Sequence, residues 1–271
     1  MTSNVRMPAV AGRFYPRDPD TLRRDVLKYI SPDVSSRIEA IGCVAPHAGY
    51  MYSAYVAGAV YSQIEIPNRV IVLCPNHTGM GHPLAIMTST RWQTPLGEVP
   101  ADAKLGTAIL QRFPALREDS AAHRSEHGIE VQLPFLQTRR ADLTFVPIAV
   151  GTRQFDILRG LGEAIADVIS AQRDRVLVVA SSDMNHYESD AITRIKDRMA
   201  IDRVLAMDPR ALWEVVMNED ISMCGFGPTV AMLTAAQRLG ATFATLAKYT
   251  TSGEISGDYE RVVGYAGIIV S

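Results

Sequence analysis

Cysteine is scarce in this sequence, and the signatures of secreted and membrane proteins are missing. Three cysteines among 271 residues are an odd number and too few for the disulfide framework of a small secreted domain. The apolar runs are far shorter than a membrane span, and residues 1–8 lack the apolar stretch of a signal peptide. These absences predict a soluble protein of the reducing cytoplasm.

An excess of one charge and the common nucleotide-binding motifs are also missing. Twenty-seven basic and 29 acidic side chains give a net charge of −2, which offers no electrostatic surface for nucleic acid or an anionic membrane. The sequence has no Gly-x-Gly-x-x-Gly fingerprint and no phosphate loop. The Ser181-Ser182 pair lacks the flanking glycines of a hydrolase nucleophile elbow. We therefore expect neither a nucleic-acid nor a membrane partner.

Short apolar runs alternate with helical patterns along the whole chain. The hydrophobic share of 47% and the charged share of 21% match an ordinary globular protein. The alternation predicts helices on both faces of a parallel sheet, and no linker-like composition divides the chain. We therefore predict a single domain over residues 1–271 of the α/β class, a three-layer αβα sandwich with a largely parallel, mixed central sheet.

Capping residues and apolar spacing set the expected elements. Helices are predicted over 18–30, from Ser53 to Ile64, 103–113, from 129 to 136, 155–172, 189–206, 209–218 and up to Gly240. Strands are predicted up to Ala45, over 70–74 and 143–150, and from Val176 onward. The segment 84–99 resembles a strand and a turn near an edge. Strands 242–250 and 261–270 are expected to pair in antiparallel fashion at the sheet margin.

Half of the six histidines follow apolar runs that are typical of buried strands. His47 follows the run from Ile41, His77 the run from Val70, and His186 the run from Val176. In α/β sheets, ligands and chemistry gather outside the carboxyl ends of the strands. We therefore expect these three histidines at one edge of the sheet, in one polar pocket.

Cys224 differs from the other two cysteines in its surroundings. It lies in a glycine-rich loop before a predicted helix, where backbone amides would lower the pKa of the thiol and favour the thiolate. Cys43 and Cys74 lie inside strand runs and are expected to fill core volume. We predict that His47, His77 and Cys224 converge on one transition metal. Two imidazoles and a thiolate suit copper, iron or zinc.

Other polar residues are expected beside this site. Asp183 and His186 are predicted to orient one another as a general acid–base pair or as partners of a metal ligand; alternatively, Asp183 only caps the following segment. His123, Glu126 and His127 form a second polar cluster. This cluster either walls the same pocket or begins a helix with solvated charges.

Six motifs that occur in order resemble the Memo family, whose bacterial and archaeal members are also called AmmeMemoRadiSam system protein B. The motifs are PAVAGRFYP (8–16), APHAGY (45–50), PNH (75–77), EHGIEVQLPF (126–135), SSDMNH (181–186) and the Cys224 loop. The similarity runs from about residue 8 to the carboxyl end. It implies that Tyr50, Glu126 and His127 belong to the pocket.

The Memo family is similar in fold to class III extradiol dioxygenases, which open catechol rings with iron held by two histidines and a glutamate. The resemblance implies that His47 and His77 match the histidine ligands and that His186 matches the histidine that acts as acid and base. Cys224 lies where the glutamate would be expected. A thiolate softens the site and shifts its preference toward copper. The resemblance also implies redox activity and a radical-enzyme partner.

The function predicted from the sequence is a metal-dependent oxidation or reduction with copper or iron as the cofactor. One alternative is an extradiol-type dioxygenase that acts on an aromatic substrate. The other alternative is a non-enzymatic module that binds a small molecule or a peptide in the same cleft. The first two functions need a metal with open coordination positions, whereas a binding module would keep its ligand after the metal is removed.

Overall fold

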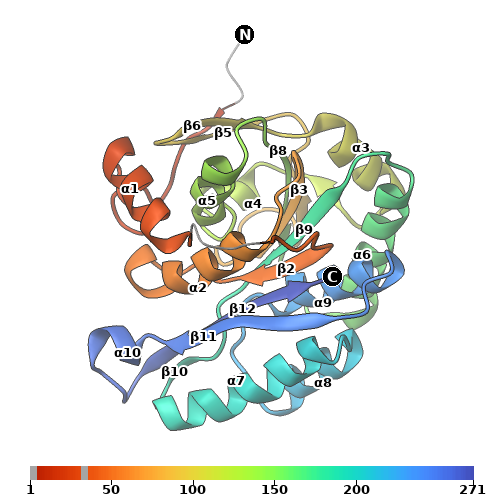
Figure 1. Cartoon of the computed structure of the whole chain (residues 1–271). Helices are drawn as coiled ribbons and strands as arrows, with labels where there is room; N and C mark the ends of the chain where they lie inside the picture. Colours follow the sequence, from red (N-terminus) through yellow and green to blue (C-terminus); the bar gives the residue numbers. More distant parts are fainter. Residues whose placement is uncertain (1–4, 32–35) are drawn as a thin grey trace.

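In the computed structural model, which describes residues 5–31 and 36–271, a nine-stranded mixed sheet forms the middle layer (Figure 1). The strand order is β10-β12-β2-β9-β3-β8-β4-β7, and β11 pairs with β12. Helices cover both faces of the sheet. The α/β sandwich that the alternation of strands and helices predicts is therefore confirmed.

The centre of the sheet is parallel. The strands β2 (Gly42–Ala45), β9 (Val176–Ser181), β3 (Arg69–Pro75) and β8 (Thr144–Val150) run parallel in this order. They consist mainly of β-branched and aliphatic residues that are buried on both faces, as expected for internal parallel strands. Their carboxyl ends therefore point to the same edge of the sheet.

Antiparallel strands flank this centre. On one side β12 (Val262–Val270) pairs with β2, and on the other β4 (Leu84–Ile86) pairs with β8. The antiparallel pairing predicted for the last two strands is confirmed by β11 (Ala244–Thr251) and β12. The marginal strands β7 (Arg117–Glu118), β10 (His186–Glu188) and β11 each pair with one neighbouring strand in the described part of the chain.

Side chains alternate along each strand and build two cores. In β3, Val72 and Cys74 face one helical layer, while Ile71 and Leu73 face the other. One layer consists of α1 (Pro19–Tyr29), α2 (Tyr50–Gln63) and α5 (Leu133–Arg139). The opposite layer consists of α3 (Ala103–Arg112), α6 (Phe155–Ser170), α7 (Asp190–Leu205), α8 (Pro209–Asn218) and α9 (Phe226–Arg238). Among the helices of the described ranges, none is long and apolar enough to cross a membrane.

Most predicted helices are found within two residues of their expected ends. The helix that Ser53 was expected to cap instead begins at Tyr50, because the Tyr50 amide donates to the Phe14 carbonyl (2.7 Å) and Gly49 is the N-cap. The helical start expected at 129 is a 3-10 turn, η1 (Glu130–Gln132), that leads into α5. Both differences arise from contacts with the N-terminal segment. The local spacing of apolar residues does not predict such contacts.

The segment 84–99 divides between two sheets. Only β4 joins the main sheet, whereas β5 (Arg91–Thr94) and β6 (Gly97–Pro100) form a hairpin that pairs with β1 (Val5–Arg6). The position near an edge that was expected for 84–99 holds in the main sheet for β4, which lies between β8 and the marginal strand β7. The remaining short helices are α4 (Ala121–Arg124) and α10 (Gly253–Ser256).

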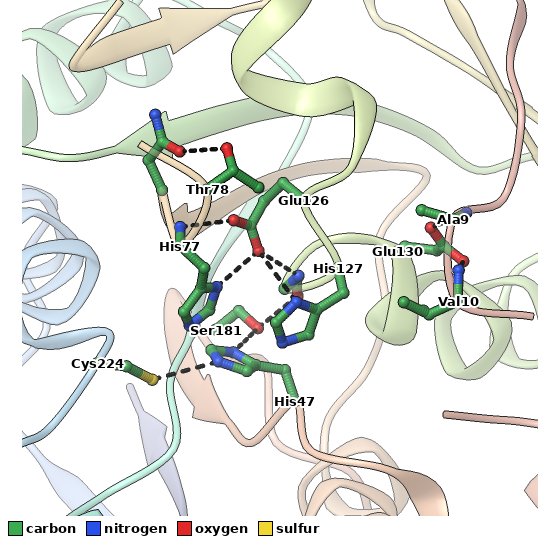
Figure 2. A network of polar contacts seen from close by, with 12 residues as sticks. Ala9, Val10, His47, His77, Thr78, Glu126, His127, Glu130, Ser181 and Cys224 are labelled. Carbon is green, nitrogen blue, oxygen red and sulfur yellow. Dashed lines mark hydrogen bonds and ion pairs between the residues drawn. The ribbon is translucent and has the colours of Figure 1, made fainter. Parts of the chain in front are cut away.

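A buried carboxylate fastens the N-terminal segment to the fold. Glu130 has no exposed surface and forms an ion pair with Arg6, whose side chain is 5% exposed. The carboxylate also accepts hydrogen bonds from the backbone amides of Ala9 (2.8 Å) and Val10 (3.0 Å), which lie beside it in Figure 2. It accepts a further hydrogen bond from the Tyr15 hydroxyl (2.6 Å). The motif 8–16 is thus held in place largely by one side chain.

Arg6 extends this connection toward the polar loop that follows α4. Its Nη2 donates to the Glu126 carbonyl (2.6 Å), and its Nε donates to the His123 carbonyl (3.1 Å). The guanidinium also lies 4.3 Å from the centre of the Trp92 ring. The loop that carries Glu126 and His127 is therefore anchored by the N-terminal strand.

Candidate metal centre

The carboxyl ends of β2, β3 and β9 open into one polar cavity of about 420 Å³. His47 lies two residues after β2, His77 two after β3, and Asp183 two after β9, while Cys224 precedes α9. The cavity is lined by Phe14, His47, Ala48, Gly49, His77, His127, Asp183, His186, Tyr187, Cys224, Val263 and Tyr265. The polar pocket expected at this sheet edge is present.

The structure brings the three predicted metal ligands together. One ligand atom from each of His47, His77 and Cys224 lies within 4.8 Å of the others, and the Cys224 sulfur is 3.2 Å from His47 Nε2 (Figure 2). Metal–ligand bonds of about 2.0–2.3 Å place the ligand atoms of a tetrahedral site roughly 3.5 Å apart. The three side chains therefore form a group that can hold a metal ion.

His47 is the most buried of the three predicted ligands, with 1% of its surface exposed. Its backbone amide donates to Asp183 Oδ1 (2.7 Å), and its Nδ1 lies 2.8 Å from the Ser181 hydroxyl. Burial, together with the nearby His77, lowers the pKa of His47 to about 3. The ring is therefore neutral at physiological pH, which is the form that binds metals.

His77 is solvent-exposed and is oriented by a buried carboxylate. Its backbone amide donates to Glu126 Oε2 (2.7 Å), and its Nδ1 lies 2.8 Å from Glu126 Oε1. Burial alone would raise the pKa of Glu126, but the hydrogen bond and charge of His77 lower it to about 2. The ionised carboxylate therefore accepts the Nδ1 proton and leaves Nε2 free for a metal, as in carboxylate–histidine–metal triads.

His127 lines this cavity, whereas Glu126 does not line it and contacts the cavity residue His77 instead. The two residues do not form a solvated helix start. Glu126 is fully buried, and the His127 ring stacks on His77 with 4.6 Å between ring centres. His77, Glu126 and His127 form a second group with ligand-like spacing. Because the carboxylate already accepts hydrogen bonds from His77, this group serves to orient that ring. Burial lowers the pKa of His127 to about 4.

The Cys224 thiol does not have the lowered pKa that its loop predicts. Burial, reinforced by the charge of Asp183, raises its pKa well above the ordinary value. The Gly225 amide donates to the Ser182 hydroxyl (3.0 Å) and so does not face the sulfur; the Asp183 amide donates to the sulfur (3.2 Å). Metal binding at Cys224 therefore has to displace the thiol proton.

Asp183 and His186 do not orient one another by a hydrogen bond, in contrast to the prediction. His186 Nδ1 lies 2.9 Å from the Ser222 carbonyl, and the His186 amide donates to the Ser222 hydroxyl (2.7 Å). A carbonyl oxygen only accepts, so His186 Nδ1 carries a proton. Asp183 instead accepts from the His47 amide, and burial raises its pKa. Ser222, which the sequence analysis did not single out, orients His186.

A second buried acid, Asp197 of α7, forms a hydrogen bond with the loop that carries His186. Asp197 Oδ1 accepts from the Asn185 amide (2.8 Å), and Oδ2 accepts from the Tyr249 hydroxyl (2.7 Å). These hydrogen bonds lower the pKa of Asp197, but burial outweighs them and raises it to about 7. Below pH 7 the folded protein therefore holds this proton more tightly than the unfolded chain does.

Because its folded-state pKa is raised, Asp197 contributes stability at low pH that is lost as the pH rises toward 7. Between pH 5 and pH 8 we expect the wild type to lose about 2–3 kcal/mol more unfolding free energy than Asp197→Asn. Urea denaturation at several pH values measures this difference. Asp202→Asn, an exposed aspartate on the same helix that pairs with Arg198, should retain the wild-type profile. If the unfolding free energies of the wild type and Asp197→Asn change with pH in parallel, the pKa of Asp197 is not raised in the folded protein.

Some pocket residues differ from the expected set. Tyr50 does not line the metal cavity: it is buried, donates to the Val131 carbonyl (2.7 Å), and borders a neighbouring groove of about 580 Å³. Phe14, Tyr187 and Tyr265 form the aromatic wall. Phe14 lies in the first motif, and Tyr187 directly follows His186, so proximity in sequence could have indicated both. No feature of the sequence near Tyr265 indicates that it lines the cavity.

Comparisons with known proteins show similarity over nearly the whole chain. A family model described as Memo-like protein matches residues 6–269. A MEMO1 family protein of Methanopyrus kandleri is 41% identical over 277 residues, covering 97% of this chain and 98% of the relative. A MEMO1 family protein of Methanosarcina mazei is 40% identical over 267 residues, covering 98% of this chain and 99% of the relative.

A solved structure shares the fold at low sequence identity. The crystal structure of an uncharacterized protein from Escherichia coli K12 matches with a TM-score of 0.56 and 13% identity, covering 84% of this chain and 98% of that protein. This similarity concerns the fold alone. The family match over nearly the whole chain and the relatives at about 40% identity establish that the chain belongs to the Memo family.

Proposed function

We propose that the protein binds one transition metal through His47, His77 and Cys224 and uses it to oxidise or reduce a small molecule in the adjoining cavity. The observation that carries this proposal is the convergence of two imidazoles and a thiol, with ligand atoms within 4.8 Å of one another. His77 is further supported by the buried Glu126 carboxylate, the kind of partner that metal-binding histidines have.

The donor set favours copper over iron, and zinc is the redox-inactive alternative. A thiolate is softer than the carboxylate of the usual two-histidine, one-carboxylate iron site. When bound, copper or iron would supply the one-electron chemistry that amino acid side chains lack. The substrate has to fit a cavity of about 420 Å³ with aromatic walls, which suits a small organic molecule.

His186 is the acid–base candidate of the proposed reaction. Its Nδ1 proton is held by the Ser222 carbonyl (2.9 Å), so Nε2 of the neutral ring keeps a lone pair with which to accept a proton from a molecule in the cavity. Asp183 lies in the same cavity and interacts electrostatically with His186. A negative Asp183 would stabilise the protonated ring.

Metal analysis of protein purified without added ions tests the proposal directly. About one equivalent of copper or iron, lost when both His47 and His77 are replaced by alanine, is the expected result. The protein should also lose its affinity for small molecules in the cavity, or its redox activity, when the metal is stripped. A ligand that binds equally well to the metal-free protein would identify a binding module instead.

Replacing Cys224 by glutamate distinguishes the redox site from an extradiol dioxygenase. We expect catechols to stay intact with the wild-type protein, and we expect Cys224→Glu to weaken copper binding by about 10-fold or more because a hard oxygen replaces a soft sulfur. Anaerobic copper titration and absorbance of the yellow ring-opened product provide the two measurements. Steady catechol cleavage by the iron-loaded wild type, abolished by His186→Ala, would establish the dioxygenase instead.

A further inference from the structure

Two buried polar residues lie behind His47 and do not line the cavity. Gln132, at the end of η1, is 1% exposed, and Ser181, the last residue of β9, is fully buried. We propose that Ser181, held by Gln132, fixes the tautomer of His47 so that Nε2 presents its lone pair to the metal. Both are positioning residues, and their role rests on the proposed metal site.

The direction of the Ser181 hydroxyl follows from its partner on the polar loop. Ser181 Oγ lies 2.6 Å from the carbonyl oxygen of Gly128. A carbonyl only accepts, so the single hydroxyl proton is donated there. The remaining contacts of this oxygen, to Gln132 and to His47, must therefore be ones in which it accepts.

The orientation of the Gln132 amide is also determined by its surroundings. Its nitrogen lies 2.9 Å from the Pro46 carbonyl and 3.3 Å from the Ala45 carbonyl, which both require a donor. Its oxygen accepts from the Tyr61 hydroxyl (2.9 Å). The amide nitrogen therefore donates to Ser181 Oγ (2.8 Å). This donation and the bond to Gly128 keep the Ser181 hydroxyl from rotating.

The tautomer of His47 follows from these contacts. Because Ser181 Oγ has no second proton, the 2.8 Å contact to His47 Nδ1 requires Nδ1 to be the donor (Figure 2). A neutral imidazole carries one N–H, so Nε2 keeps its lone pair and lies 3.2 Å from the Cys224 sulfur. The exposed His77 obtains the same tautomer from a carboxylate. For the buried His47, a neutral hydroxyl avoids placing a second charge in the core.

The tautomer can be measured on the metal-free protein. We expect ¹⁵N NMR of histidine-labelled wild type to show His47 protonated at Nδ1, with Nε2 unprotonated. Ser181→Ala should lose this preference and Ser181→Thr, which keeps the hydroxyl, should restore it. Gln132→Leu, of similar volume but without the amide donor, should shift it in the same direction as Ser181→Ala. Wild-type His47 protonated at Nε2 would overturn the proposal.

Co²⁺ affinity provides the second measurement, followed by the thiolate charge-transfer band. Ser181→Ala is expected to bind Co²⁺ about 10- to 100-fold more weakly, the usual cost of removing a residue that orients a metal ligand. Ser62→Ala is the matched control. Its buried hydroxyl donates to the Gly58 carbonyl (2.6 Å) and accepts from the Ser31 amide (2.7 Å), away from the cavity. The control should lose stability but keep its Co²⁺ affinity.

The outcomes separate this inference from the metal proposal. Equal Co²⁺ affinity in Ser181→Ala, Ser62→Ala and the wild type would show that Ser181 does not position a ligand. If the protein takes up no Co²⁺ but wild-type His47 is protonated at Nδ1 and Ser181→Ala loses this preference, the metal proposal fails while the assignment of the tautomer to Ser181 stands. If Gln132→Leu keeps the wild-type tautomer of His47 and the wild-type Co²⁺ affinity, Gln132 is not a positioning residue.

Discussion

Replacing Cys224 by serine is expected to lower the affinity for copper by more than about 100-fold, because it removes a direct ligand, whereas losing a residue that only orients a ligand costs 10- to 100-fold. The serine hydroxyl is a hard, neutral donor, whereas the thiolate is soft and charged. His47 and His77 would remain as a two-nitrogen site. Titration with a copper-chelating competitor, under reducing conditions for Cu⁺, measures the change.

The two core cysteines provide matched controls. Cys43 and Cys74 are fully buried in β2 and β3, so serine in their place buries a hydroxyl in an apolar site. We expect Cys43→Ser and Cys74→Ser to lose about 1–3 kcal/mol of stability while keeping their copper affinity. Copper binding by Cys224→Ser equal to that of the wild type would show that the thiol is not a ligand.

The largest expected loss of stability follows the replacement of Glu130 by glutamine. The change keeps the shape of the side chain but leaves the Arg6 charge buried without its counter-ion. It also places an NH2 donor against one of two backbone donors, the Ala9 amide at the Oε2 position or the Val10 amide at the Oε1 position. Removing one partner of a buried ion pair typically costs about 3–5 kcal/mol. Urea denaturation at neutral pH measures the loss.

An exposed ion pair provides the control for Glu130→Gln. Arg91 and Glu98 lie 3.4 Å apart with 65% and 40% of their side chains exposed, and pairs of this kind contribute little to stability. Glu98→Gln should therefore leave the unfolding midpoint almost unchanged. The double variant Arg6→Met, Glu130→Leu should recover part of the loss, because no unpaired charge remains. If Glu130→Gln and Glu98→Gln unfold at the same midpoint, the buried pair does not stabilise the N-terminal segment.

Local sequence patterns were sufficient to predict the fold and the sheet edge at which His47 and His77 meet. Strand ends marked by His47 and His77, the helix predicted over 209–218, and the alternation of strands and helices all depend on residues that are close in sequence. Parallel strands necessarily bring their carboxyl ends to one edge. The meeting of His47 and His77 therefore followed from the topology.

The tertiary structure alone decided how these side chains are oriented and charged. The glycine-rich sequence around Cys224 predicts a thiolate, yet burial beside Asp183 raises the pKa of the thiol. Asp183 is close to His186 in sequence, yet Ser222, which comes from a distant loop, holds the His186 ring. Hydrogen-bond partners and desolvation depend on how segments that are far apart in sequence pack together. The periodicity and spacing of residues within one segment do not predict that packing.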